Sequence, residues 1–372
     1  MKINYRFILL GIIFSSSLPT FSQISFKKSE VKNIIKKVAD WQIAHQKEVK
    51  HGEINWTNAT LYLGMLEWAK MAEEEDQDSS YYKWLLRIGS RNYWQVDQRM
   101  YHADDIAISQ IYIDLYRKYK KNAMIVPTIA RAEWVMEHPS KGSFELDYSK
   151  PKTLERWTWC DALFMAPPVY AKLYRLTGDK KYIKFLNKEY KATYDYLFDK
   201  KENLFFRDWH YFTQKEENGK KIFWGRGNGW VLGGLTEILQ ELPKKDKNRK
   251  FYEELYIKLC TRVAELQNKD GFWHASLLDP DSYPSPETSC TTFNVYAMAY
   301  GVNEGILDKK VFLPIVIKGW KALVSSVDED GKLGYVQPVG ADPKKVTREM
   351  TEVFGVGAFL LAGNQIYRMA EL

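Results

Sequence analysis

Apolar residues recur at helical spacing through most of the chain, and this pattern predicts about twelve helices. The helical patterns begin near Ser29, Thr57, Ser80, Asp105, Ala123, Thr153, Lys180, Asn228, Phe251, Thr288, Lys310 and Glu349. Short turns rich in Gly, Pro, Asn and Asp separate them, which is typical of helices joined as hairpins. No alternating strand pattern of useful length interrupts the series, so we expect an all-α protein.

Residues 24–372 contain no linker or low-complexity segment, which predicts a single domain. Helices joined in pairs within one domain favour an (α/α)6 barrel, with six helical hairpins in an inner and an outer ring. A solenoid is the alternative, but its repeats would share one period, whereas the apolar positions here recur at uneven spacing. Binding groups are expected in the longer loops, because a rigid scaffold usually carries them there. These loops are 101–105, 204–226, 271–289 and 331–347.

The first 23 residues have the pattern of a secretory signal peptide. Lys2 and Arg6 precede an apolar run over residues 7–14, and Ser and Pro residues follow it. That run is too short to cross a bilayer, and no other stretch approaches the roughly 18 apolar residues required. We therefore expect an exported protein without a membrane span, located in a periplasm or secreted.

The charge balance is mildly positive, because 54 Lys and Arg residues against 47 Asp and Glu give a net charge of +7. Loss of Lys2 and Arg6 with the leader lowers it by two, to +5. The basic residues are scattered between the helical patterns, which argues against nucleic acid as a partner. A small positive surplus instead suits a small anionic substrate.

The cysteines, Cys160, Cys260 and Cys290, are too few for a disulfide framework and too widely spaced for a zinc site. The His and carboxylate residues also lack a ligand spacing such as His-x-x-x-His, so we expect neither a metal ion nor a cofactor. Aromatic residues make up 15% of the chain, with 13 Trp and 24 Tyr. Such rings line sugar-binding clefts, although cores use them too.

Asp161 is the first candidate catalytic residue. It lies among Trp157, Trp159, Leu163 and Phe164, and apolar surroundings disfavour the ionised form of a carboxyl group. The helical spacing places it on an inward helix face, where its proton would be available near neutral pH. The alternative is a buried structural Asp that bonds to a neighbouring backbone.

Two further clusters carry polar side chains that suit sugar chemistry. Asp104 and Asp105 follow His102 at a predicted helix start; one of them is accounted for as a helix cap, which leaves the other for the substrate. Arg226 lies in a glycine-rich segment near Trp230, and a guanidinium there suits a carboxylate, unless the glycines only serve a tight helix crossing.

The segment 204–211 adds Arg207 and His210 just before that glycine-rich segment. A lone His is most often a satisfied hydrogen-bond partner, and no Gly-x-Ser-x-Gly elbow signals a serine nucleophile. Carboxylates, arginines and tryptophans remain, and these residue types are typical of enzymes that act on carbohydrates.

Five motifs in this order resemble glycoside hydrolase family 105, the unsaturated rhamnogalacturonyl hydrolases. They are 102–105 (His-Ala-Asp-Asp), 157–168 (Trp-Thr-Trp-Cys-Asp-Ala-Leu-Phe-Met-Ala-Pro-Pro), 224–230 (Trp-Gly-Arg-Gly-Asn-Gly-Trp), 286–289 (Pro-Glu-Thr-Ser) and 352–363. The resemblance implies a six-hairpin helical barrel without a metal. Its central cleft would bind a lyase product, an oligosaccharide ending in a 4,5-unsaturated uronic acid. In this family an Asp protonates C4, water adds at C5, and the resulting hemiketal collapses to release the next sugar.

Carried over to this chain, the resemblance places Asp161 at the position of the catalytic acid, which then serves as base. It places Asp104 or Asp105 beside the sugar hydroxyls, and the sequence does not decide between them. The substrate-binding residues that it implies are Trp56, Asn58, His102, Trp157, Arg207, His210, Arg226 and Trp230.

The segment around Arg207 and His210 departs from the pattern of some family members, so the leaving sugar stays open among rhamnogalacturonan, ulvan and arabinogalactan-type chains. Two other functions remain as alternatives. One is a conventional inverting glycosidase with two carboxylates roughly 6.5 to 9.5 Å apart. The other is a sugar-binding protein without catalysis, in which Asp161 is structural.

Overall fold

The computed structural model describes residues 26–370, so the predicted leader lies outside the described residues. Two short strands, β1 (Phe198–Asp199) and β2 (Leu204–Phe205), pair antiparallel. The α-helices are α1 (Lys28–His45), α2 (Trp56–Asp76), α3 (Ser80–Arg91), α4 (Ser109–Tyr119), α5 (Val126–Glu137), α6 (Ala162–Met165), α7 (Pro167–Thr177), α8 (Lys180–Leu197), α9 (Gly225–Glu241), α10 (Arg249–Glu265), α11 (Thr288–Asn303), α12 (Lys309–Ser325) and α13 (Val353–Met369).

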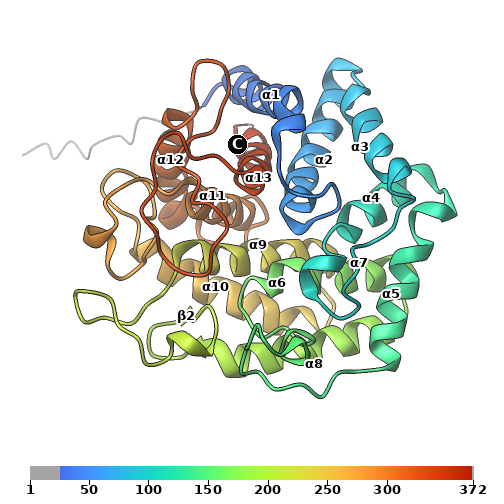
Figure 1. The fold of residues 1–372 in the computed structure, drawn as a ribbon. Coiled ribbons are helices and arrows are strands. Elements are labelled where there is room, and N and C mark those ends of the chain that lie inside the picture. The colour runs from blue at the N-terminus through green and yellow to red at the C-terminus, as the bar shows by residue number, and fades with distance from the viewer. Residues whose placement is uncertain (1–25, 371–372) are drawn as a thin grey trace, which may run out of the picture.

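Six of these helices form a closed inner ring. Each of α2, α4, α7, α9, α11 and α13 contacts the next, and α13 returns to α2; Figure 1 shows these helices from the two ends of the chain side by side. The helices α1, α3, α5, α8, α10 and α12 pack on this ring from outside, each against one or two inner helices. The predicted (α/α)6 barrel is confirmed, since a solenoid would leave its first and last helices apart.

The inner helices are buried on almost every face. Every residue from Thr288 to Val302 of α11 is buried, for example, whereas outer α8 alternates buried and exposed positions. Close helix contacts require small residues, and a Cβ on Gly64 of α2 would lie 2.1 Å from the carbonyl oxygen of Gly357 in α13. The ring closes at this point because neither glycine has a side chain.

Two predicted helix starts were wrong. The helix expected from Thr153 begins at Ala162, so Asp161 precedes α6 and does not lie within a helix. Tertiary bonds hold this segment in bends and turns: the Cys160 amide donates to the carbonyl of Arg207 at 2.8 Å, and the Thr193 hydroxyl donates to the carbonyl of Trp157. The helix expected from Asp105 begins at Ser109, after a 3-10 turn over Ala103–Ile106.

The short helix α6 is held between two inner helices by unusual bonds. Pro168 has no amide hydrogen, so the carbonyl of Phe164 lacks its normal helical donor. The side-chain amide of Gln110 in α4 donates to that carbonyl at 2.9 Å and to the carbonyl of Met165 at 3.1 Å. The sequence of α6 and α7 thereby fixes the position of the preceding residue, Asp161.

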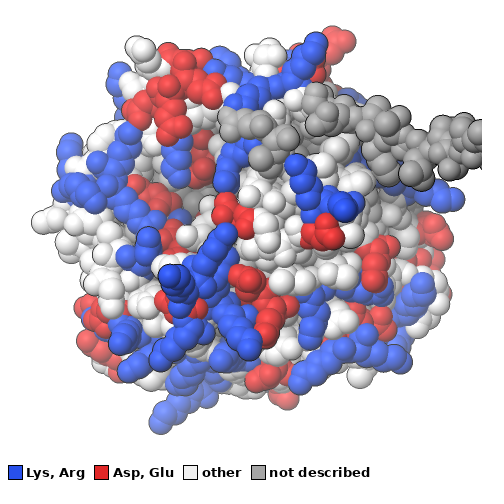
Figure 2. Space-filling view, turned by 180° about the vertical axis from the view of Figure 1, so that it is seen from behind, with Lys and Arg blue, Asp and Glu red and all other residues white. Residues whose placement is uncertain are grey.

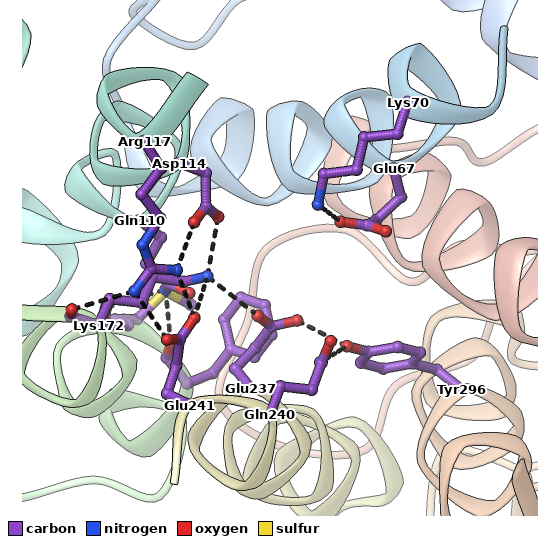
Figure 3. A network of polar contacts seen from close by, with 12 residues as sticks. Glu67, Lys70, Gln110, Asp114, Arg117, Lys172, Glu237, Gln240, Glu241 and Tyr296 are labelled. Carbon is purple, nitrogen blue, oxygen red and sulfur yellow. Dashed lines mark hydrogen bonds and ion pairs between the residues drawn. The ribbon is translucent and has the colours of Figure 1, made fainter. Parts of the chain in front are cut away.

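A buried ionic network lies at the end of the barrel that is remote from Arg226 (Figure 3). The ammonium group of Lys172 lies 2.8 Å from Asp114, 3.3 Å from Glu241 and 3.7 Å from Glu237. Arg117 pairs with Glu241 as well. Arg226 and Glu241 stand at the two ends of α9, which separates them by about 22 Å at 1.5 Å per residue. Acidic side chains also lie among the basic ones on the face shown in Figure 2, so the positive surplus is spread out.

Candidate active site

A cavity of about 330 Å³ opens at the end of the barrel where α2, α6 and α9 begin. Its walls combine two carboxylates, two guanidinium groups and several aromatic rings. The lining residues are Trp56, Asp104, Tyr148, Trp159, Asp161, Met165, Arg207, Trp224, Arg226, Trp230, Val339, Gly340 and Ala341. The predicted acid, the arginines and two of the predicted tryptophans therefore come together.

Asp161 lies in this cavity with only 8% of its surface exposed. Burial raises the pKa of its carboxyl group, and the nearby charges of Arg207 and Arg226 oppose that rise. Its Oδ2 atom lies 3.5 Å from Nε of Arg207 and 3.5 Å from the thiol of Cys160. A carboxyl group whose pKa is raised by burial and held back by two cations is suited both to donate and to accept a proton.

The structure separates the roles of the two neighbouring aspartates. Asp105 does not line the cavity. Its carboxylate accepts hydrogen bonds from Nε of Arg99 at 3.0 Å and from the backbone amide of Arg99 at 2.7 Å. Asp104 lines the cavity, and burial raises its pKa to about 7, opposed by Arg99 and reinforced by Asp161. Neither serves as the helix cap; His102 does so, because its Nδ1 accepts from the amide of Asp104.

Arg207 and Arg226 are held by the protein and still offer free donors. Arg207 donates to Asp208 at 2.7 Å and to the Tyr148 hydroxyl at 2.8 Å. Arg226 donates to the carbonyls of Gln337 and Pro338. Within residues 26–370, the Nε atom of each arginine is buried and has no hydrogen-bond partner. Two guanidinium groups beside one cavity favour a ligand with a negative charge.

Aromatic rings form the wall opposite the carboxylates. The rings of Trp56 and Trp230 meet edge to face at 5.8 Å, and Trp56 stacks on Phe354 at 5.4 Å. Arg226 lies over the ring of Trp224 at 4.5 Å. Flat apolar surfaces with polar edges suit the two faces of a sugar ring.

Four residues predicted to bind substrate lie outside the cavity lining. Asn58 is buried and its side chain holds the loop before α2, by donating to the carbonyl of Gly52 and accepting from Gln46. His102 and Trp157 line a separate small pocket. His210 is largely exposed and bonds to Asp208. None of these four side chains lines the cavity, so their substrate-binding role stays a prediction.

Other lining residues were not among the predicted site residues. Trp159 and Trp224 stand inside the motifs and were recoverable from them. Residues 339–341 lie in the loop 331–347, which was expected to carry binding groups, whereas Tyr148 comes from a loop whose sequence carries no such signal. The loop over 331–347 is positioned by buried Glu287, whose carboxylate accepts from the Gln337 amide at 3.0 Å and caps α11.

The described residues hold no group of three or more His, Cys, Asp or Glu side chains arranged for a metal ion. Within the same residues, no helix has the length and apolar character needed to cross a bilayer.

Burial lowers the pKa of His102 to about 3, with Arg99 and Arg207 contributing, so this imidazole beside the site is neutral.

Residues 34–370 match the model of Glycosyl Hydrolase Family 88. The unsaturated 3S-rhamnoglycuronyl hydrolase of Formosa agariphila is 38% identical over 379 residues, covering 100% of this chain and 99% of that protein. The solved family 88 glycosyl hydrolase of Bacteroides vulgatus is 31% identical with a TM-score of 0.80, covering 92% of this chain and 99% of that one.

A solved possible member of family 105 from Salmonella enterica shares the fold, with a TM-score of 0.75 at 18% identity, over 97% of this chain and 100% of that one. The motifs had indicated a hydrolase of unsaturated uronyl oligosaccharides, and the full-length similarity to such an enzyme confirms that resemblance. Matched over almost its whole length and folded as a closed helical barrel, the chain belongs to glycosyl hydrolase family 88.

Proposed function

We propose that this protein removes a 4,5-unsaturated uronic acid from the non-reducing end of acidic oligosaccharides. The observation that carries the proposal is the placement of Asp161, a buried acid with a raised pKa, in a cavity that two arginines and several tryptophans also line. The similarity to the unsaturated 3S-rhamnoglycuronyl hydrolase of Formosa agariphila supports it.

In the proposed reaction, Asp161 transfers its proton to C4 of the unsaturated ring, and the charge that develops at C5 is taken up by water. The carboxylate then accepts a proton from that water, so its proton count is restored. The hemiketal formed at C5 opens to a C5 ketone and a hemiacetal at C1. The hemiacetal then collapses to an aldehyde, the C1–O bond to the neighbouring sugar breaks, and the hemiacetal proton passes to the leaving oxygen. A positioned acid of this kind typically contributes about 10² to 10⁴-fold to the rate.

The other cavity residues bind and orient the substrate in this scheme. Arg207 and Arg226 line the cavity and attract the uronate carboxylate by their positive charge. Asp104, whose pKa is raised to about 7, hydrogen-bonds a sugar hydroxyl as donor or acceptor near neutral pH. Trp56 and Trp230 stack on the ring.

For the leaving sugar we propose the rhamnoglycuronyl type that the name of the Formosa agariphila relative specifies. A 4,5 double bond arises when a lyase eliminates the group at C4 of a uronic acid. The enzyme therefore acts downstream of a polysaccharide lyase. We also propose that residues 1–23 direct export, since basic residues precede a short apolar run there.

A conventional inverting glycosidase is the second candidate, because Asp104 and Asp161 both line the cavity and both carry raised pKa values. Ultraviolet absorbance separates the two: hydration of the unsaturated ring removes the conjugated double bond, while hydrolysis of a saturated sugar leaves absorbance unchanged.

The test is turnover of an unsaturated rhamnoglycuronyl disaccharide followed by that absorbance. Asp161→Asn should lower kcat by at least about 10²-fold and leave the melting temperature nearly unchanged. Asp281→Asn, an exposed aspartate in the loop over 271–289, is the control and should keep full activity. Full activity of the Asp161→Asn variant would remove Asp161 from its role, and unchanged absorbance with the wild type would reject the reaction.

A further inference from the structure

A second cavity of about 360 Å³ lies at the same end of the barrel as the active site. It is formed by the last turn of α1, the segment after it, and the residues that lead into α13. Its lining residues are Trp41, Gln42, His45, Glu48, Val49, Lys50, His51, Thr351, Glu352 and Val353. None of these residues lines the active-site cavity or takes part in the proposed reaction.

One pair of stacked rings connects the walls of the two cavities. Trp56 lines the active site and stacks at 5.4 Å on Phe354, which directly follows Val353 in the wall of the second cavity. His51 of the second cavity stands five positions before Trp56 in the sequence. The second cavity is thus next to the active site, on the side of the aromatic wall.

The second cavity carries the kinds of group that bind sugars. The indole of Trp41 stacks on the ring of His45 at 4.1 Å, and its Nε1 donates to Asp330 at 3.0 Å, so its orientation is fixed. His51 and Glu352 form an ion pair at 3.1 Å with both side chains partly exposed. A fixed indole face beside polar groups is the arrangement that binds a pyranose ring.

We propose that this cavity is a distal subsite that binds a further sugar unit of longer oligosaccharides, beyond the sugar released by the reaction. The inference rests on the proposed function, because the same substrate occupies both cavities. Trp41 stacks on the distal sugar, and His51 and Glu352 bind its hydroxyl groups. The enzyme then distinguishes substrates by length, through contacts far from the reacting bond.

The test compares an unsaturated disaccharide with the tetrasaccharide of the same series. In the wild type, KM for the tetrasaccharide should be about tenfold lower, which corresponds to about 1.4 kcal/mol of added binding. Trp41→Ala should remove that advantage, leave KM for the disaccharide within twofold, and leave kcat unchanged for both. Trp41→Phe keeps a flat ring and should retain part of the advantage.

The chain offers a closely matched control in Trp134 of outer helix α5. Trp134 stacks on His138 at 4.6 Å with the same four-residue spacing as Trp41 and His45, and its carbonyl likewise bonds to the histidine Nδ1. Trp134→Ala removes an equivalent helix-surface stack away from the second cavity. It should change KM for neither substrate.

Equal KM values for the two lengths in the wild type would overturn the subsite, as would a Trp41→Ala variant that weakens both substrates alike. The subsite is separable from the proposed function by calorimetry with a saturated oligosaccharide of the same backbone. If the wild type binds the saturated oligosaccharide and Trp41→Ala abolishes that binding, the subsite is supported even when the unsaturated disaccharide is not turned over. If the wild type consumes the disaccharide but does not bind the saturated oligosaccharide, the subsite is rejected and the proposed function stands.

Discussion

Nε of Arg207 lies 3.5 Å from Oδ2 of Asp161, and within the described part of the chain no acceptor forms a hydrogen bond with that Nε atom. Nη1 of Arg207 donates to Asp208 and to the Tyr148 hydroxyl, and these two bonds fix the orientation of the guanidinium. Burial raises the pKa of Asp161, and Arg207 is the first of the charges that hold it down. This pair therefore sets the pH range in which the acid keeps its proton.

Replacing Arg207 with Gln should shift the pH dependence of kcat/KM. The reaction needs protonated Asp161, so activity falls as pH rises through its pKa; loss of the cation raises that pKa and moves the alkaline limb to higher pH. KM should rise as well, because a uronate contact is lost. Arg207→Lys keeps the charge and should shift the limb less. A limb that stays in place in both variants would contradict the assignment.

Cys160 should act on the same carboxylate as a weak donor, since its thiol lies 3.5 Å from Oδ2 and is fully buried. Cys160→Ala removes the donor, so the alkaline limb should move up by about half a pH unit and kcat should fall several-fold. Cys160→Ser keeps a hydroxyl donor and should restore most of both. If Ala and Ser behave alike in pH profiles, the thiol only fills space.

Asp104 should make the protein less stable at alkaline pH. Its pKa is raised to about 7 in the folded state from 3.8, so its protonated form favours folding below pH 4 and this contribution is lost as pH rises to 7. The loss is at most ~4 kcal/mol. Asp104→Asn cannot ionise, so denaturant unfolding should find it more stable than the wild type at pH 8, with the difference shrinking at pH 5. An equal difference at both pH values would contradict the shift.

Lys172→Met should strongly destabilise the barrel without changing KM or kcat. The variant leaves Asp114, Glu237 and Glu241 buried without their shared cation, at a cost of about 3–5 kcal/mol in unfolding free energy. KM and kcat of the folded fraction should not change, since the network lies at the far end of the barrel. Lys118→Met, which breaks a partly exposed pair with Glu73, should cost under about 1 kcal/mol.

The same network sets an acid limit for the fold. Lys172 and Arg117 lower the pKa of Glu241 to about 2 against the effect of burial. A lowered pKa contributes stability above the unfolded value near 4.5, and this stability is lost as pH falls towards 2. Glu241→Gln should therefore flatten the loss of stability between pH 5 and pH 2, as followed by circular dichroism. If the wild type and the variant lose stability in parallel between pH 5 and pH 2, Glu241 is not the source of this acid sensitivity.

The sequence by itself determined the helical class and the paired helices, and it singled out Asp161 as the candidate acid. The helices were predictable because apolar residues recur at helical spacing along the chain. Asp161 was recognisable as a candidate because apolar neighbours raise the pKa of a carboxyl group. The segment around Arg226 was equally visible, because its single cation lies between Trp224 and Trp230 among several glycines.

Only the tertiary structure decided which neighbours share the cavity. Asp104 and Asp105 are adjacent and chemically identical, and the difference arises because Arg99 binds one of them. Tyr148 and residues 339–341 reach the site from loops outside the five motifs. The side chain of Asn58 accepts from Gln46, and that of His210 bonds to Asp208. Local order fixes what each segment can form, whereas ring closure brings side chains hundreds of positions apart into contact, and that depends on packing between helices.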